Sequence, residues 1–156
     1  MRLPYDTLAA DGMNALAATS AYIHRSELEK SLVDLVYLRA SQINGCAYCI
    51  DRYGREAIAA GANVQKLMVV SAWRDADGLF TARERAALDW TEVVTWIAGN
   101  QVPDEAFLAA QEAFTDKELA DLTLAIGLIN VHNRMAISFR RTPALVSDIQ
   151  DPQRTM

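Results

Sequence analysis

Cysteine is scarce in this chain of 156 residues, because only Cys46 and Cys49 occur and both stand in one Cys-Ala-Tyr-Cys tetrapeptide. A disulfide-dense scaffold is therefore excluded, and the chain is long enough to bury a core without cross-links. In a compartment that keeps thiols reduced, an isolated pair at this spacing is more often redox-active or metal-binding than structural. The scarcity of cysteine thus directs attention to the tetrapeptide itself.

Clusters of basic residues and long apolar runs are also missing. The net charge is −5 and no Lys/Arg cluster occurs, which argues against a nucleic-acid partner. The longest uncharged runs, such as Met13–Ile23 and Leu122–Val131, are shorter than the roughly 20 residues that cross a bilayer. No N-terminal targeting pattern is recognisable. We therefore expect no membrane association and a cytoplasmic location.

Alternating strand patterns are absent too, so the sequence predicts an all-α fold. Three segments fit the capping box at a helix start: Ser26–Glu29, Thr81–Glu84 and Thr115–Glu118. The expected helices cover residues 11–25, 27–42, 46–60, 63–74, 81–98, 103–113 and 116–141. We expect one compact multi-helix domain over residues 1–156, with its core at about 11–142 and an irregular tail marked by Pro143 and Pro152.

The last expected helix is apolar nearly all round. Such a helix is either central to its own fold or covered by another subunit, and the pattern leaves both options open. Trp73, Trp90 and Trp96 have apolar neighbours at helical spacing, and we interpret them as core or subunit contacts.

The cysteine pair follows Asn44-Gly45 and falls at the start of an expected helix. Side chains three positions apart share a helix face, so a small movement brings two sulfurs to disulfide distance. The N-terminus of a helix also favours a thiolate, through its partial positive charge and free N–H groups. The sequence therefore predicts a dithiol that can cycle between reduced and oxidised forms.

Two further side chains are candidates for the same site. Asp34 is the only ionisable residue in the apolar run Leu32–Leu38, and buried carboxylates normally have a partner. Tyr53 lies one helical turn after Cys49. If the two helices pack antiparallel, Asp34 approaches the turn that carries Cys49 and Tyr53.

The segment Leu35–Ala57, above all its Ser-Gln-Ile-Asn-Gly-Cys-Ala-Tyr-Cys run, resembles the core of the AhpD-like alkylhydroperoxidases of the carboxymuconolactone decarboxylase family. Asn130–Ala136 is similar to a segment of small members of that family. The resemblance implies a helical homo-oligomer, often a trimer or hexamer. It also implies thiol peroxidase or disulfide reductase activity without a metal or an organic cofactor, with an external dithiol reductant or a peroxiredoxin as partner.

The resemblance further implies roles for individual residues. Cys49 is the thiol that attacks the peroxide, and Cys46 resolves the resulting sulfenic acid. Asp34 occupies the position of a relay glutamate, and Tyr53 occupies the position of a relay histidine. Because a phenol titrates near pH 10, Tyr53 is a poor base that can still pass a proton, and Asp34 would be the final base.

The two histidines carry less specific signals. His132 is a secondary candidate, since it could replace the missing relay histidine, add a third metal ligand to the two cysteines, or simply pack as a partly buried side chain. We expect His24 to be a capping or surface residue.

Four functions are compatible with these observations. The sequence favours a peroxidase that reduces alkyl or hydrogen peroxides through the cysteine pair. The alternatives are a redox-sensing or structural oligomer without turnover, a metal-binding protein, and a cofactor-free enzyme resembling the carboxymuconolactone decarboxylases. That last activity does not depend on paired cysteines.

Overall fold

A computed structural model describes residues 1–145, and its regular elements are all helical, as the sequence predicts. The elements are α1 (Tyr5–Leu8), α2 (Ala10–Ile23), α3 (Lys30–Asn44), α4 (Ala47–Ala59), α5 (Val64–Val69), the 3₁₀ helix η1 (Val70–Asp75), α6 (Ala82–Thr95), α7 (Ile97–Asn100), α8 (Asp104–Gln111) and α9 (Asp116–Ser138). Pro143 falls in the irregular stretch after α9, whereas Pro152 lies outside the described residues.

Two of the three predicted capping boxes are confirmed. The hydroxyls of Thr81 and Thr115 accept the N–H groups of Glu84 and Glu118, and each glutamate accepts the N–H of its threonine in return. The third prediction is wrong. The Ser26 hydroxyl donates to the Ile23 carbonyl and closes a turn after α2, so that α3 begins only at Lys30.

Other differences concern single turns. The expected helix at 63–74 divides into α5 and η1, and the one at 81–98 ends at Thr95. A short helix at Tyr5–Leu8 precedes α2 and was not predicted.

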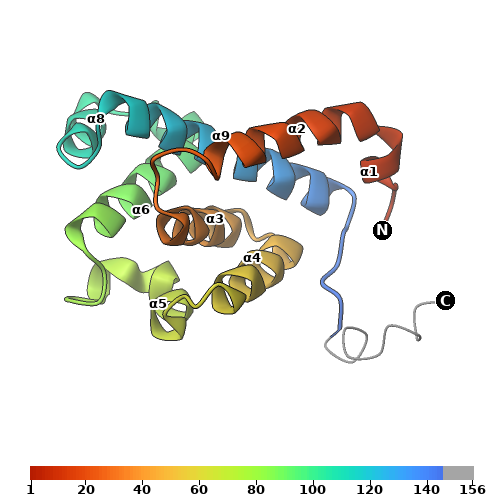
Figure 1. Cartoon of the computed structure of the whole chain (residues 1–156), viewed down its shortest axis with the longest axis horizontal. Coiled ribbons are helices and arrows are strands. Elements are labelled where there is room, and N and C mark those ends of the chain that lie inside the picture. The colour runs from red at the N-terminus through yellow and green to blue at the C-terminus, as the bar shows by residue number, and fades with distance from the viewer. Residues whose placement is uncertain (146–156) are drawn as a thin grey trace.

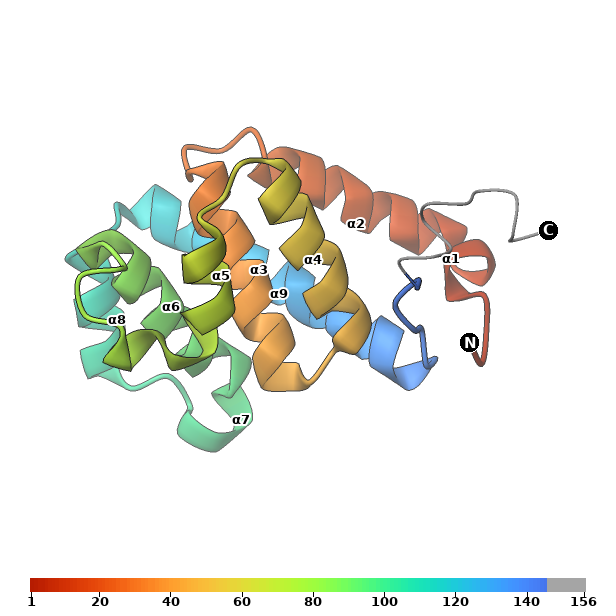
Figure 2. The ribbon, with the colours of Figure 1, turned by 90° about the horizontal axis from the view of Figure 1, so that it is seen from below.

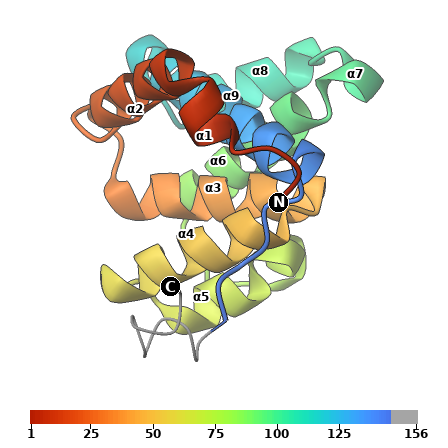
Figure 3. The same cartoon turned by 90° about the vertical axis from the view of Figure 1, so that its right-hand side faces the viewer.

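Helix α3 lies at the centre of the molecule. Figures 1 and 3 show α2 and α9 on one side of it and α4 on the other, with α5 beyond α4. Helices α6, α7 and α8 form the end of the molecule away from the chain's N-terminus (Figure 2). This arrangement gives α3 one face toward α9 and another toward α4.

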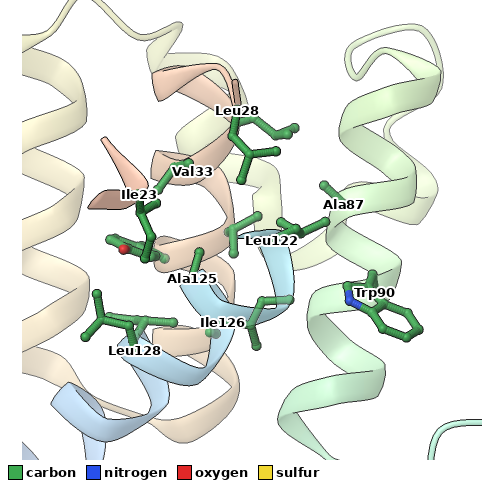
Figure 4. Close-up of a cluster of buried hydrophobic side chains, with 14 of the residues drawn as sticks. Ile23, Leu28, Val33, Ala87, Trp90, Leu122, Ala125, Ile126 and Leu128 are labelled. Carbon is green, nitrogen blue, oxygen red and sulfur yellow. The ribbon is translucent and has the colours of Figure 1, made fainter. Parts of the chain in front are cut away.

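The main core forms where α9 packs between α3 and α6. Figure 4 shows Leu122 and Ile126 of α9 close to Val33 of α3 and Ala87 of α6. All four side chains are buried, so removing them from water stabilises the fold by about 1–3 kcal/mol for each of the larger ones. A second cluster joins α3 to α4, α5 and η1 through residues that include Leu35, Ala57, Leu67 and Trp73.

The apolar last helix is therefore central to its own fold. Trp73 and Trp90 are core residues, as expected, but Trp96 is 53% exposed and contributes to neither core cluster. Between residues 1 and 145, none of the helices combines the length and apolarity that a bilayer crossing requires.

Candidate active site

The cysteine pair is delivered by the tight turn that joins α3 to α4, two neighbouring antiparallel helices (Figure 2). Gly45 adopts φ +69° and ends α3. The N–H of Gly45 donates to the Gln42 carbonyl at 3.2 Å, and the N–H of Cys46 donates to the Ser41 carbonyl at 2.9 Å. These two bonds define a Schellman motif, which fixes the direction in which the chain enters α4.

Cys46 is the N-cap of α4. Its sulfur accepts the backbone N–H of Cys49 at 3.3 Å, and the two Cα atoms are 5.3 Å apart, inside the range of a disulfide. The two sulfurs are placed as a disulfide pair, and each cysteine is only 1% exposed. The predicted position of the pair at a helix start is confirmed. An N–H directed at the Cys46 sulfur favours its thiolate when the pair is reduced.

Cys49 lines a small cavity of about 60 Å³, together with Tyr53, Arg52 and His132. These last three residues also line a larger cavity of about 560 Å³ between α2, α3, α4 and α9. The two cavities therefore share a wall, and of the two only the smaller one is lined by Cys49.

Asp34 and Tyr53 both line the larger cavity, but the structure gives Asp34 another partner. Lys30, one turn earlier on α3, donates to the Asp34 carboxylate at 2.6 Å. Tyr37 packs edge to face against Tyr53, with ring centroids 5.0 Å apart, and it lines the same cavity as Asp34. Among the described residues, no direct hydrogen bond joins Asp34 to Tyr53.

Burial dominates the electrostatics of the site. It raises the pKa of Tyr53 to about 12 against the opposing charge of Arg52, and it also raises the pKa of Tyr37. Burial and the nearby Arg52 guanidinium both lower the pKa of His132. At neutral pH the phenols are therefore protonated donors, and the imidazole is neutral.

A buried polar network ties the end of α3 to α9. Asn133 is fully buried and donates to the Ser41 hydroxyl at 3.0 Å, while Asn44 donates to the side-chain oxygens of Asn133 at 2.8 Å and Asn130 at 3.0 Å. The network holds the turn that precedes Cys46. It also fixes the rotation of α9, which places His132 at the cavities.

The histidines differ as expected in exposure, since His132 is half-buried and His24 is exposed at the rim of the larger cavity. Within residues 1–145, no group of three or more His, Cys, Asp or Glu side chains is arranged to hold a metal ion. The hypothesis that His132 is a third metal ligand beside the two cysteines therefore has no geometric support.

Sequence reasoning missed several residues of the site. Tyr37 lies three positions after Asp34 on the same helix face, a spacing that could have suggested it. Arg52 forms an ordinary surface pair with Glu56, yet it also lines both cavities. Tyr5 and Arg141 meet at the small cavity from opposite ends of the sequence, a contact that no local pattern indicates.

Comparisons with known proteins found a matching family model and similar proteins. The model of the carboxymuconolactone decarboxylase family matches residues 8–93. The uncharacterised protein YdfG of Bacillus subtilis is 33% identical over 137 residues, which cover 88% of this chain and 92% of that protein.

Two crystal structures are also similar. One, a protein of unknown function from Agrobacterium tumefaciens named as a candidate antioxidant defence protein AhpD, has a TM-score of 0.87 and 38% identity, covering 92% of this chain and 98% of its own. A peroxidase-related protein with an AhpD core from Ralstonia eutropha has a TM-score of 0.74 at 24% identity, covering 86% of this chain and 72% of its own. The second similarity concerns the fold alone.

Proposed function

The chain belongs to the carboxymuconolactone decarboxylase family as an AhpD-like member, and we propose that it is a thiol-dependent peroxidase and disulfide oxidoreductase for alkyl or hydrogen peroxides. One observation carries the proposal. Cys46 and Cys49 lie at disulfide distance at the start of α4, and Cys49 lines a small cavity.

The first step is attack by the Cys49 thiolate on one oxygen of the peroxide. The S–O bond forms as the O–O bond breaks, and Cys49 becomes a sulfenic acid. The other oxygen leaves as an alcohol, or as water from hydrogen peroxide, once it has taken up a proton.

The second step closes the disulfide. The Cys46 thiolate attacks the Cys49 sulfur, and the sulfenic oxygen leaves as water with one further proton. The Cys46 sulfur accepts a hydrogen bond from the backbone N–H of Cys49, and this bond stabilises the Cys46 thiolate for the second step. An external dithiol carrier then gives two electrons and two protons to the disulfide, restores both thiols and is itself oxidised to a disulfide. As a disulfide oxidoreductase, the reduced pair would instead pass its two electrons to an oxidised peroxiredoxin.

The proton of the Cys49 thiol needs an acceptor near the small cavity. We assign this role to His132, because it is neutral at pH 7 and lines the cavity with Cys49. Tyr53, which lines the same cavity, remains protonated and is no base at this pH. The alternative prediction is a proton relay in which Tyr53 passes the proton of the Cys49 thiol to Asp34. The ion pair between Asp34 and Lys30 argues against this relay.

Assembly into a homo-oligomer, either a trimer or a hexamer, is part of the proposal. Several large apolar side chains are exposed on α7, α8 and α9, among them Ile97, Leu108, Leu124 and Ile137. Burying them between subunits would remove apolar surface from water. We place the reaction in the cytoplasm, where dithiol carriers keep such a pair reduced.

A redox sensor without turnover is the second candidate. The burial of both cysteines favours it, since a sulfur that is 1% exposed reacts only with molecules that enter the cavity. A sensor would show a defined reduction potential without steady-state consumption of peroxide.

Stopped-flow measurement of the reduced protein with several peroxides tests the proposal. We expect a fast phase that survives Cys46→Ser and is lost in Cys49→Ser. Loss of the phase only in Cys46→Ser would reverse the two roles. A fast phase without turnover in the presence of a dithiol carrier would favour the sensor.

A further inference from the structure

The small cavity beside Cys49 is bordered by positive charge. It is lined by Arg52 of α4 and by Arg141 of the segment after α9, and within residues 1–145 no aspartate or glutamate lines it. Both arginine side chains are accessible, since they are 49% and 31% exposed. The volume of about 60 Å³ leaves room for a molecule of a few heavy atoms, well below the roughly 300–1,000 Å³ of sites for larger ligands.

A turn at the end of α9 places Arg141 at this cavity. The N–H groups of Arg140 and Arg141 donate to the carbonyls of Ile137 at 3.1 Å and Ala136 at 2.9 Å, which defines a Schellman motif. The left-handed position of this motif, at φ +52°, is occupied by Arg140 instead of a glycine. Such a conformation costs about 1–2 kcal/mol and persists where surrounding contacts hold it.

Aromatic side chains supply such contacts to Arg141. Its Nη1 donates to the Tyr5 hydroxyl at 3.1 Å, and its guanidinium carbon lies 4.5 Å from the centre of the Tyr48 ring. The Asp6 carboxylate is 3.6 Å from the same nitrogen, which is too long for a hydrogen bond, and the Asp6 side chain is exposed. Because solvent screens a pair of this kind, the charge of Arg141 is only weakly neutralised.

The charge of Arg52 also reaches the cavity. Arg52 donates to Glu56 through Nε at 2.8 Å, and within the described part of the chain its two Nη atoms make no hydrogen bond. Burial and Arg52 both lower the pKa of His132, and Arg52 opposes the rise that burial causes in the pKa of Tyr53. His132 and Tyr53 line the same cavity, so Glu56 does not cancel the positive charge there.

We propose that the small cavity binds a small anion between the guanidinium groups of Arg52 and Arg141, and that it thereby favours negatively charged reactants at Cys49 over neutral ones of the same size. Charge-assisted hydrogen bonds from two guanidinium groups suit a carboxylate or another small oxyanion. For the peroxidase, the favoured substrates are then small peroxides that carry a negative charge. That link rests on the proposed function, whereas the selection of anions at the thiol does not.

Alkylation of Cys49 tests the proposal without peroxide chemistry. Iodoacetate and iodoacetamide have nearly the same size and react with sulfur in the same way, but only iodoacetate is charged. The two reagents compete for the reduced Cys46→Ser variant of the full chain, in which Cys49 is the only thiol, and mass spectrometry measures the product ratio. A change in the thiolate fraction of Cys49 affects both reagents equally, so the ratio reports charge selection. The same variant unfolded in urea gives the intrinsic ratio.

We expect the folded protein to favour iodoacetate about 3- to 10-fold more than the unfolded protein does, the effect of a partly screened charge pair. Arg141→Gln should lose most of this preference, and Arg141→Lys, which keeps the charge, should retain it. Arg140→Gln is the matched control, because it removes the same charge from a neighbouring position that does not line the cavity. High salt should reduce the preference.

Equal product ratios in the folded and unfolded protein would overturn the proposal, as would failure of both reagents to modify Cys49 in the folded protein. An unchanged ratio in Arg141→Gln, or an equal fall in Arg140→Gln, would overturn it as well. None of these results decides the stopped-flow test of the cysteines with peroxides, so the two proposals can fail separately.

Discussion

At the scale of single residues, burial moves the pKa values of Tyr53 and His132 in opposite directions. Burial opposes the charged form of each group, so the pKa of the phenol rises to about 12 and the pKa of the imidazole falls. Tyr53 is then a proton donor at neutral pH, and His132 is a proton acceptor. The imidazole comes from α9, a different helix from the one that carries the cysteines.

Replacement of His132 should slow the reaction with peroxide. In His132→Gln we expect the single-turnover rate at pH 7 to fall about 100-fold, the lower end of general-base effects. Because burial and Arg52 lower the pKa of His132, the wild-type rate should fall only at a pH below the usual titration range of an imidazole, where His132 becomes protonated and cannot accept a proton. His132→Gln should lose this dependence. His24→Gln is the control, since His24 is exposed at the rim. An unchanged pH profile in His132→Gln would remove His132 from the mechanism.

Gly45 should be the glycine least tolerant of a side chain at the site. Gly45→Ala places a β-carbon at φ +69°, which costs about 1–2 kcal/mol of unfolding free energy although no atom lies within 4 Å of that carbon. Urea denaturation measures the loss. Gly12→Ala, in the helical backbone of α2, should instead stabilise the protein by about 0.5–1 kcal/mol. Equal effects of the two substitutions would contradict the conformational explanation.

Residue patterns predicted part of this site. The cysteine pair at a helix start was predictable because spacing and capping are local properties. The burial of Asp34 followed from its apolar run, but its pairing with Lys30 rather than Tyr53 depends on side-chain rotamers. The spacing of Tyr37 from Asp34 indicates a shared helix face, but the packing of Tyr37 against Tyr53 of the next helix is a property of the folded chain.

At the scale of elements, α9 joins the core to the site. Leu122 and Ile126 face α3 and α6, whereas Asn133 bonds to Ser41 at the end of α3. Periodicity predicted that α9 exists and is largely buried, but it left open whether its own fold or another subunit covers it. The capping boxes at Thr81 and Thr115 could be predicted because their hydrogen bonds join residues three positions apart. The prediction at Ser26 failed because its hydroxyl donates to the Ile23 carbonyl of the preceding helix.

The link between α3 and α9 should depend on Asn133. Asn133→Ala leaves the buried Ser41 hydroxyl and Asn44 amide without this partner, so we expect a loss of about 2 kcal/mol in unfolding free energy. The rate at which the cysteine pair closes should also fall, because the turn before Cys46 is less firmly held. Val131→Ala, which removes an exposed apolar side chain from the same helix, should change stability by no more than about 0.5 kcal/mol. Similar losses in both variants would contradict a specific role for Asn133.

At the scale of the whole molecule, a buried carboxylate joins the two halves of the core. Glu92 of α6 accepts hydrogen bonds from Arg39 of α3 at 2.8 Å and Trp73 of η1 at 2.9 Å, and it also pairs with Arg74. Burial alone would raise the pKa of Glu92, but these donors hold it below its usual value. Long-range pairs of this kind cannot be read from sequence, because the partners are separated by up to 53 positions.

The stability of the protein should therefore depend on the ionisation of Glu92. Because the folded-state pKa of Glu92 lies below that of the unfolded chain, its contribution is present above about pH 4.5 and is lost as the pH falls. We expect Glu92→Gln to lose about 3 kcal/mol of unfolding free energy at neutral pH and much less under acid conditions. Asp89→Asn is the control, since Asp89 binds the same Arg74 at the surface. A loss that is independent of pH would contradict this explanation.

The identity of the sulfur that peroxide oxidises tests the central claim most directly. The Cys46→Ser variant, treated with one equivalent of peroxide in the presence of dimedone, should carry a single dimedone adduct on Cys49 by peptide mass spectrometry. The Cys49→Ser variant should carry none. An adduct on Cys46 in Cys49→Ser, with Cys49 unmodified in Cys46→Ser, would contradict the account.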